Sequence, residues 1–474
     1  MIEAYRNSVV IRNVDFDSEN YKRFFKSFAV YDKVTHKYTN NVFTISNYDV
    51  YTPASIDPEI IRGYFPNDII VYNKKCSKTI INEFNMIHFP RNEIQKQALN
   101  FLLSMKNDDN KRERLLALNT GTGKTFVTIS FISQMKLKPF IVVDQIGLAD
   151  QWKREFLKHS DLKEDEIKIL SGRASVEEAL ENPEKYKAFI AIHKTLNMML
   201  SESLKSINIL MNKLEIGIRV FDEAHVNFKN VCMISSLSNV EFTVFLTATP
   251  NRSNFMDNLV YRKVFGKLPY YNGQNIITEK YQTVFLGHYD SHPSIDIRET
   301  IKTQRGLNIP RWSKHILTDG FDYYIDSLYT LIDKFQLIER KKQTVIYLPT
   351  IELIEKTYQF LSEHYEGIDV GMYIGKVSEE KRLEVLKQQF IITNEKIFGR
   401  AMDLETLEFV ITYLPISSPI TVEQIIGRLR YHEGKLQILI DMTDRGFPEC
   451  RAQSYSRKRV YKQKAKIIKE FNLD

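Results

Sequence analysis

The segment Leu118-Asn119-Thr120-Gly121-Thr122-Gly123-Lys124-Thr125 decides how this chain is interpreted. It follows an apolar run at 115–118 and precedes a helical pattern at 126–135, the strand, glycine loop and helix order of a phosphate-binding loop. Glycines let backbone N–H groups approach phosphate oxygens, and the helix N-terminus adds partial positive charge. We expect Lys124 to reach the β- and γ-phosphates and the Thr125 hydroxyl to ligate Mg²⁺. The strict pattern begins with glycine, where this segment has Leu118.

A second segment, Val220-Phe221-Asp222-Glu223-Ala224-His225, is an apolar strand that ends in two adjacent carboxylates. Because the chain leaves the extended conformation there, neighbouring side chains can serve different roles. We expect Asp222 to hold the Mg²⁺ that bridges the phosphates, and Glu223 to orient or deprotonate the attacking water. Alone, an Asp-Glu pair would be an ordinary acidic loop. About 100 residues after a phosphate loop, it indicates ATP hydrolysis.

Short apolar runs alternate with helical patterns in two separate series. The first series is 115–118, 140–143, 188–192, 218–221 and 243–246, and the second is 344–347, 370–373, 390–392, 409–413 and 437–440. Parallel sheets covered by helices on both faces have this texture. The fold class predicted is therefore α/β, with two tandem parallel-sheet domains.

The predicted boundaries follow from changes in this texture. Residues 1–88 form a small α+β domain with short β-rich runs and a helix at 18–28 that Ser18 caps. Residues 89–275 form the first sheet domain, 276–320 a connector marked by Pro and Gly, and 321–445 the second sheet domain. Residues 446–474 form a basic C-terminal segment with a helix at 457–471.

Composition excludes several classes of protein. The 474 residues are 43% hydrophobic and 26% charged, which is typical of a folded globular chain and argues against disorder. The chain has no apolar run of about 18 residues and no apolar signal core, so we expect neither a membrane span nor export. Three widely spaced cysteines make neither a disulfide framework nor a zinc site, which predicts a reducing, intracellular (cytoplasmic) location.

The basic charge is concentrated at one end of the chain. The net charge is +7, and residues 445–474 carry nine Lys and Arg against three Asp and Glu. A polyanion such as nucleic acid would bind this tail, for example through Lys458 and Arg459. A solvated helix is the alternative interpretation.

Several motifs together resemble a known family. Thr120 to Thr125, Asp222 to His225 and Thr247-Ala248-Thr249-Pro250 resemble motifs I, II and III of the superfamily 2 helicases and translocases. The segments 398–403 and 424–430 resemble motifs V and VI. Residues 148–153 (Leu-Ala-Asp-Gln-Trp-Lys) resemble motif Ia of the UvsW-type, XPB/RecG-like branch of DNA helicases with a DEAH motif. The matches keep the family's order from about residue 89 to 430.

The resemblance implies two RecA-like domains that bind ATP and Mg²⁺ and act on a nucleic-acid strand. It implies catalytic roles for Lys124, Glu223, Gln424 and Arg428, with Arg428 as an arginine finger. The residues implied in nucleotide binding are Gln95, which reads adenine, with Thr120, Gly121, Thr122, Gly123, Lys124, Thr125, Asp222 and Arg430. The residues implied in coupling hydrolysis to the strand are His225, Thr247, Thr249, Gly399 and Asp403.

Some positions depart from the family's pattern. Motif VI usually has a second arginine where Tyr431 stands, so Arg430 is the candidate for that role. Motif Ia usually has Pro-Thr where Asp144-Gln145 stands, and Asp144 would repel a phosphate unless turned away, so no strand contact is carried over to it. Thr393, before motif V, is expected to donate to the strand backbone. Trp152 is expected to pack within an amphipathic helix.

The function predicted is an ATP-dependent DNA helicase or translocase, acting as a monomer, that remodels branched or forked DNA in recombination, repair or replication. The N-terminal domain has the size and position of a duplex-recognition domain in UvsW-type proteins. The alternatives are a transcript-release or complex-remodelling factor that translocates without unwinding, or an RNA helicase. A phage or large-virus source, and then the host cytoplasm, is implied by the UvsW-type resemblance alone.

Overall fold

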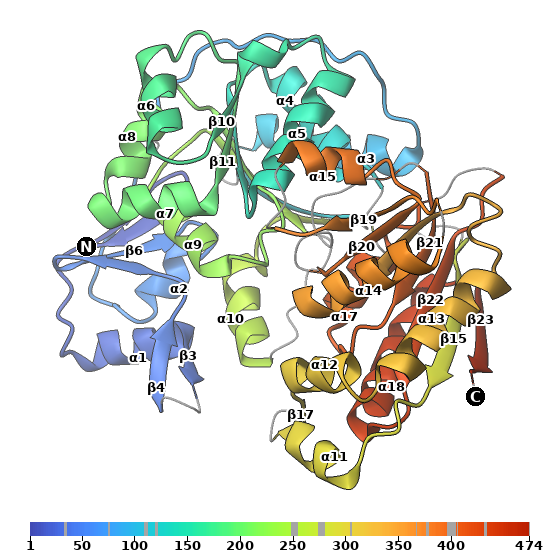
Figure 1. Cartoon of the computed structure of the whole chain (residues 1–474). Coiled ribbons are helices and arrows are strands. Elements are labelled where there is room, and N and C mark those ends of the chain that lie inside the picture. The colour runs from blue at the N-terminus through green and yellow to red at the C-terminus, as the bar shows by residue number, and fades with distance from the viewer. Residues whose placement is uncertain are drawn as a thin grey trace. The chain divides into compact units, whose positions relative to one another are not determined.

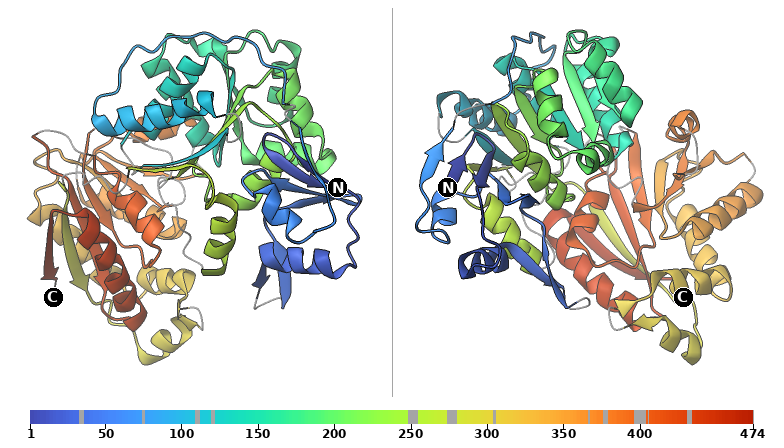
Figure 2. Two further views of the ribbon diagram at one scale, coloured as in Figure 1. Left: turned by 180° about the vertical axis from the view of Figure 1, so that it is seen from behind. Right: turned by 90° about the vertical axis from the view of Figure 1, so that its left-hand side faces the viewer.

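The chain forms two compact units, Met1–Ile277 and Thr278–Asp474. The computed structural model describes residues 1–473 except 33–35, 74–75, 109–111, 119–121, 248–254, 274–279, 304–305, 366, 376–378, 396–403, 405 and 431–433. Figures 1 and 2 show the elements of both units. Among the described residues, no helix has the length and apolar character needed to cross a bilayer.

The first unit begins with the small α+β region that the sequence predicts. Its elements are β1 (Ile2–Ala4), β2 (Ser8–Ile11), α1 (Glu19–Phe28), β3 (Ala29–Asp32), β4 (Lys37–Asn40), β5 (Thr44–Ser46), β6 (Asp49–Pro53), α2 (Pro58–Arg62) and β7 (Ile70–Tyr72). The sheet order is β5-β6-β2-β1-β7, and β3 and β4 form a separate antiparallel pair. The Ser18 side chain accepts a hydrogen bond from the Tyr21 N–H, so the predicted N-cap of α1 is confirmed.

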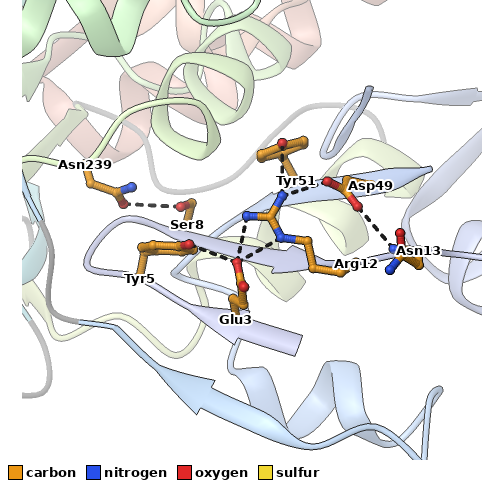
Figure 3. A network of polar contacts seen from close by, with 8 residues as sticks. All are labelled: Glu3, Tyr5, Ser8, Arg12, Asn13, Asp49, Tyr51 and Asn239. Carbon is orange, nitrogen blue, oxygen red and sulfur yellow. Dashed lines mark hydrogen bonds and ion pairs between the residues drawn. The ribbon is translucent and has the colours of Figure 1, made fainter. Parts of the chain in front are cut away.

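Polar contacts hold this region together and join it to the rest of the unit. The Arg12 guanidinium donates to Glu3 at 2.8 Å and to Asp49 at 2.6 Å, which ties β2 to β1 and β6 (Figure 3). The Ser8 hydroxyl donates to Asn239 Oδ1 at 3.2 Å, across a large separation in sequence (Figure 3). The N-terminal region therefore packs directly on the domain that follows it.

A parallel sheet forms the rest of the first unit. Its elements are α3 (Glu93–Leu103), η1 (Ser104–Asn107), β8 (Glu113–Ala117), α4 (Lys124–Met135), β9 (Pro139–Val143), α5 (Ile146–His159), η2 (Glu164–Glu166), β10 (Ile167–Leu170), α6 (Arg173–Glu181), β11 (Ala188–Ile192), α7 (His193–Glu202), α8 (Ser206–Lys213), β12 (Ile218–Phe221), α9 (Phe228–Ser236), β13 (Phe242–Thr247), α10 (Phe255–Phe265) and β14 (Tyr270–Asn272). The strand order is β10-β11-β9-β12-β13-β8-β14. The pairings between these described strands are parallel.

The second unit repeats this architecture. Its elements are β15 (Thr283–Tyr289), α11 (Ile295–Ile301), β16 (Lys302–Thr303), β17 (Gly306–Leu307), α12 (Ile309–Leu317), α13 (Phe321–Lys334), β18 (Gln343–Tyr347), α14 (Ile351–His364), β19 (Val370–Tyr373), α15 (Glu379–Val385), β20 (Phe390–Thr393), β21 (Leu407–Thr412), α17 (Pro419–Ile426), β22 (Ile438–Asp444), α18 (Pro448–Lys464) and β23 (Ile467–Asn472). The strand order is β19-β20-β18-β21-β22-β15-β23. The predicted fold class, two tandem RecA-like parallel-sheet domains after a small α+β region, is confirmed.

Two predicted segments differ from the structure. The stretch 276–320, expected as a connector, contains β15, which pairs in parallel with both β22 and β23. The helix expected at 457–471 is instead α18, which begins at Pro448 and ends at Lys464, followed by the edge strand β23. Proline and glycine correctly indicated loops around β15, but the short strand between these loops was not recognised from the sequence. In the tail, the predicted helix ran through Ile467 and Ile468, two β-branched residues that favour a strand.

Candidate nucleotide site

The candidate site lies where four neighbouring parallel strands of the first unit end. The glycine loop follows β8, motif Ia follows β9, the DEAH segment follows β12, and motif III begins at the end of β13. These strands are adjacent in the order β9-β12-β13-β8. In open α/β sheets, ligands bind outside the carboxyl ends of the strands, so the topology gathers these segments where a ligand would bind.

Gly123 and Gln95 shape the glycine loop. Gly123 adopts a φ of 93°, and a Cβ added there would lie 2.5 Å from Gln95 Nε2. That amide donates to the Thr122 carbonyl oxygen at 3.1 Å, while Gln95 Oε1 accepts the Arg91 N–H at 2.9 Å. The residue expected to read adenine therefore also supports the loop.

Lys124 and Glu223 bring the loop and the DEAH segment together. Lys124 is the first residue of α4, and its Nζ lies 3.1 Å from Glu223 Oε1. Glu223 has a φ of 46°, a left-handed conformation that is uncommon for residues other than glycine. Such strained residues concentrate at functional sites. The turn agrees with the expectation that the chain leaves the extended conformation between the two carboxylates.

Asp222 is held by hydrogen bonds to each carboxylate oxygen. The Glu223 N–H donates to Oδ1 at 3.0 Å, and the Trp152 indole Nε1–H donates to Oδ2 at 2.9 Å. Burial raises the pKa of the Asp222 carboxyl, and the nearby negative charge of Glu223 adds to the increase. Lys124 opposes it. The site thus concentrates negative charge where a cation would stabilise it.

The fit to Mg²⁺ follows from the chemistry of these donors. Mg²⁺ prefers oxygen ligands, and is bound through one or two carboxylates together with substrate phosphates. Asp222 offers such a carboxylate, and Thr125 offers a hydroxyl on the first turn of α4. The Lys124–Glu223 contact joins these two segments, and the oxygen donors of Thr125 and Asp222 are of the kind that Mg²⁺ binds.

His225 and Thr247 form a buried pair beside the carboxylates. His225 Nδ1 lies 2.9 Å from Thr247 Oγ1 and 3.3 Å from Glu223 Oε2. Thr247 ends β13 and is fully buried. The DEAH segment and motif III are therefore in contact, as the expected coupling role requires.

The expected residues of motif VI lie in the second unit. Gln424 is on α17, and Arg428 follows that helix, its N–H donating to the Ile425 carbonyl at 3.2 Å. Arg430 lies two residues further on. The roles of these three residues in nucleotide hydrolysis stay predictions.

The residues expected to contact nucleic acid lie in different surroundings. Thr393 is fully buried, and its hydroxyl donates to the Tyr373 carbonyl oxygen at 2.7 Å. The Thr393 hydroxyl is thus hydrogen-bonded within the second sheet, and its contact with a phosphate backbone stays a prediction. Lys458 is paired with Glu470 of β23, whereas Arg459 is exposed. Thr120, Gly121, Thr249, Gly399 and Asp403 lie outside the described residues.

Two contacts around the site were not foreseen. Trp152 packs in α5 as expected, but it also bonds to Asp222. Asp144 accepts a hydrogen bond from the Asn227 side chain, so this carboxylate is directed toward the DEAH loop. The sequence indicates that the N–H of a buried Trp152 needs a hydrogen-bond acceptor, but it does not identify which residue is the acceptor.

Comparisons with known proteins find similar sequences. Residues 88–252 match the family model described as "Type III restriction enzyme, res subunit", and residues 324–432 match "Helicase conserved C-terminal domain". A protein of African swine fever virus named "Putative ATP-dependent RNA helicase QP509L" is 26% identical over 381 residues, covering 74% of this chain and 68% of that protein. "Transcript termination protein A18" of Yaba-like disease virus is 24% identical over 385 residues, covering 75% of this chain and 72% of that protein.

The fold is similar to that of a solved structure. The structure described as S. cerevisiae Dbp5 bound to RNA and ADP BeF3 has a TM-score of 0.54 at 13% identity, and the alignment covers 88% of this chain and 94% of that one. At this identity the likeness concerns the fold. Together with the two matched family models, it leads to one conclusion: the chain has two RecA-like domains, and residues 88–252 and 324–432 within them are similar to the two family models.

Proposed function

We propose that this protein is a nucleic-acid-dependent ATPase that uses ATP and Mg²⁺ to translocate along a strand. The observation that carries the proposal is the contact between Lys124 Nζ and Glu223 Oε1 at 3.1 Å, which joins the phosphate loop to the DEAH carboxylates. A lysine on a glycine loop and a carboxylate pair at a strand end are the parts that phosphoryl transfer requires.

The chain's own residues have distinct roles in this proposal. When ATP binds, its phosphates replace Glu223 as the partner of Lys124, which frees the Glu223 carboxylate to orient the attacking water. Bound Mg²⁺ would neutralise charge on the phosphate oxygens, and Thr125 and Asp222 would hold it. His225 and Thr247 would pass the state of Glu223 to β13. Gln424, Arg428 and Arg430 would act on the nucleotide, Arg428 as the arginine finger.

The relatives favour transcript release as the task of this motor. One relative is named an RNA helicase and another a transcript termination protein, and both are viral. We therefore propose that the protein translocates to release or displace RNA, in the cytoplasm of an infected cell. Arg459, exposed on α18, would contribute a phosphate contact.

Remodelling of branched DNA is the second candidate. The residues at 148–153 resemble motif Ia of DNA-branch helicases, and the small N-terminal region packs on the first helicase domain through Ser8 and Asn239. A region fixed in this way could present a duplex to the motor.

The ATPase assignment is tested by Lys124→Ala and Glu223→Gln. Each variant should lose nucleic-acid-stimulated ATP hydrolysis by at least about 100-fold while its circular dichroism and melting temperature stay near wild type, because each removes a group that acts on the phosphates. Phosphate release is the measurement. Lys194→Ala and Glu177→Gln, on exposed sites of α7 and α6, are the matched controls. Wild-type turnover in either active-site variant would refute the assignment.

The substrate is tested by a panel of nucleic acids. Transcript release predicts displacement of RNA from a stalled transcription complex without separation of forked DNA strands. Unwinding of forks and four-way junctions, with no release of transcript, would instead support the second candidate. The Lys124→Ala protein serves as the inactive control in both assays.

A further inference from the structure

Trp152 lies on α5, the helix that carries the motif Ia residues, and no role in the nucleotide site has been assigned to its side chain. Its side chain is 1% exposed, and its indole Nε1–H donates to Asp222 Oδ2 at 2.9 Å, across 70 residues of sequence. A buried indole N–H needs a hydrogen-bond acceptor. A carboxylate is the strongest acceptor that a protein offers to an uncharged donor. Because Asp222 is that acceptor, the hydrogen bond links the buried face of α5 to a residue assigned to Mg²⁺.

The segment that carries Trp152 also holds the main chain of the DEAH loop. The Asp222 N–H donates to the Val142 carbonyl oxygen at 2.9 Å, at the end of β9. Asp144, which follows β9, accepts a hydrogen bond from the Asn227 side chain. The continuous segment from β9 to α5 therefore contacts the DEAH loop at the Asp222 N–H, at Asp222 Oδ2 and at the Asn227 side chain.

These contacts restrict the Asp222 side chain. Oδ1 is bonded by the adjacent Glu223 N–H at 3.0 Å and Oδ2 by the Trp152 indole, so the plane of the carboxylate is set from two directions. A carboxylate bonded once on each oxygen keeps further lone pairs for a metal. Partners that orient a ligand in this way commonly change metal affinity or activity by 10- to 100-fold when they are removed.

We propose that Trp152 is a positioning residue of the ATPase site, whose indole N–H holds Asp222 in the orientation that binds Mg²⁺. The inference rests on the proposed function, because it assigns Asp222 to the ion. It assigns to Trp152 a role beyond filling the core: the N–H, and not only the ring, contributes to the site.

The test removes the N–H and keeps an aromatic ring. Trp152→Phe should weaken binding of a fluorescent, non-hydrolysable ATP analogue about 10-fold in the presence of Mg²⁺ and leave its affinity in EDTA unchanged. The Mg²⁺ concentration that gives half-maximal ATPase should rise by a similar factor. A residue that only fills the core would not change the ratio between the two affinities.

Trp312 provides a matched control. It is also 1% exposed, and its indole N–H donates to Asp444 Oδ2 at 3.1 Å in the second unit. Trp312→Phe should leave the ratio of affinities with and without Mg²⁺ at the wild-type value. If Trp152→Phe does not fold, 3-benzothienylalanine at position 152 keeps the bicyclic shape without the N–H and should give the same 10-fold loss.

The outcomes separate this inference from the proposed function. A wild-type protein whose nucleotide affinity does not depend on Mg²⁺ would overturn the assignment of Asp222 and with it the proposed site. A wild-type protein with Mg²⁺-dependent binding, together with an unchanged ratio in Trp152→Phe or the benzothienyl variant, would overturn the role of Trp152 alone.

Discussion

Gly123 shows how a single residue is required by two constraints at once. Its φ of 93° suits glycine, and an added Cβ would lie 2.5 Å from Gln95 Nε2. Gly123→Ala should therefore destabilise the protein by about 1–3 kcal/mol and weaken ATP binding at least about tenfold, because the loop and the Gln95 amide must both shift. A fluorescent ATP analogue measures the affinity.

Gly172 is the control for strain outside the site. It has a φ of 88° but nothing within 4 Å of an added Cβ. Gly172→Ala should lower the stability and leave the ATP affinity unchanged. An equal loss of affinity in both variants would mean that general destabilisation, and not the loop, explains the effect of Gly123→Ala.

His193 gives the first unit a pH dependence. Burial lowers the pKa of His193 to about 4, which Asp144 partly opposes. Between about pH 4 and pH 6.5, the His193 side chain is protonated more in the unfolded chain than in the folded one. The stability that neutral His193 contributes is therefore complete above about pH 6.5 and is lost as the pH falls. His193→Asn should remove about 2 kcal/mol of the difference in unfolding free energy between pH 7 and pH 5.

Urea unfolding at the two pH values measures this contribution. The exposed His364 on α14 is the control, and His364→Asn should keep the wild-type difference. The assignment fails if His193→Asn shows the same pH dependence as wild type.

At the scale of elements, α18 is a structural part of the second sheet domain. Arg457 is 2% exposed and donates from Nε to Asp441 at 2.8 Å, from Nη1 to the Ile416 carbonyl at 2.9 Å and from Nη2 to Thr443 at 3.1 Å. Asp441 is fully buried on β22. The pair joins the helix to the strand, and to the loop that leads to α17 and motif VI.

Arg457→Leu should destabilise the second unit by about 3–5 kcal/mol, because it leaves the Asp441 charge buried without its partner. Thermal and urea unfolding measure the loss. Arg459→Leu, on the exposed side of the same helix, should change stability by less than about 0.5 kcal/mol. If the double variant with Asp441→Leu is no more stable than Arg457→Leu alone, the uncompensated charge is not the cause.

At the scale of the whole molecule, Asn7 joins the N-terminal region to the first parallel-sheet domain. Its Nδ2 donates to Glu113 at 2.9 Å and to Thr243 at 3.0 Å, and its Oδ1 accepts the Val240 N–H at 2.7 Å. Asn7 is fully buried. The two parts therefore share one polar core and should move as one body.

Asn7→Ala should lower the unfolding free energy by about 1–3 kcal/mol, because the Val240 N–H loses its buried acceptor. Asn212→Ala, on an exposed site of α8 where the amide donates to the Asn208 carbonyl of the same helix, should have little effect. Urea unfolding followed by circular dichroism measures both variants. Equal stabilities would show that the junction at Asn7 does not hold the two parts together.

The sequence by itself determined the two sheet domains, their order and the segments that meet at the candidate nucleotide site. An apolar run indicates that its strand is buried, and the glycine loop and the DEAH segment indicate local backbone conformation. The strands and these two segments can therefore be recognised without knowing which strands become neighbours. Ser18 as an N-cap was predictable for the same reason, since capping involves residues three apart.

Only the tertiary structure decided the contacts that depend on which strands become neighbours. The sequence does not state that β9 lies beside β12, and that adjacency brings the Val142 carbonyl to Asp222 and Trp152 within reach of its side chain. The same holds for β15 and β23, which lie far apart in the chain yet pair in the second sheet. Strand pairing depends on the total packing energy of the whole domain. Hydropathy and turn residues, in contrast, indicate only the local environment of each short segment.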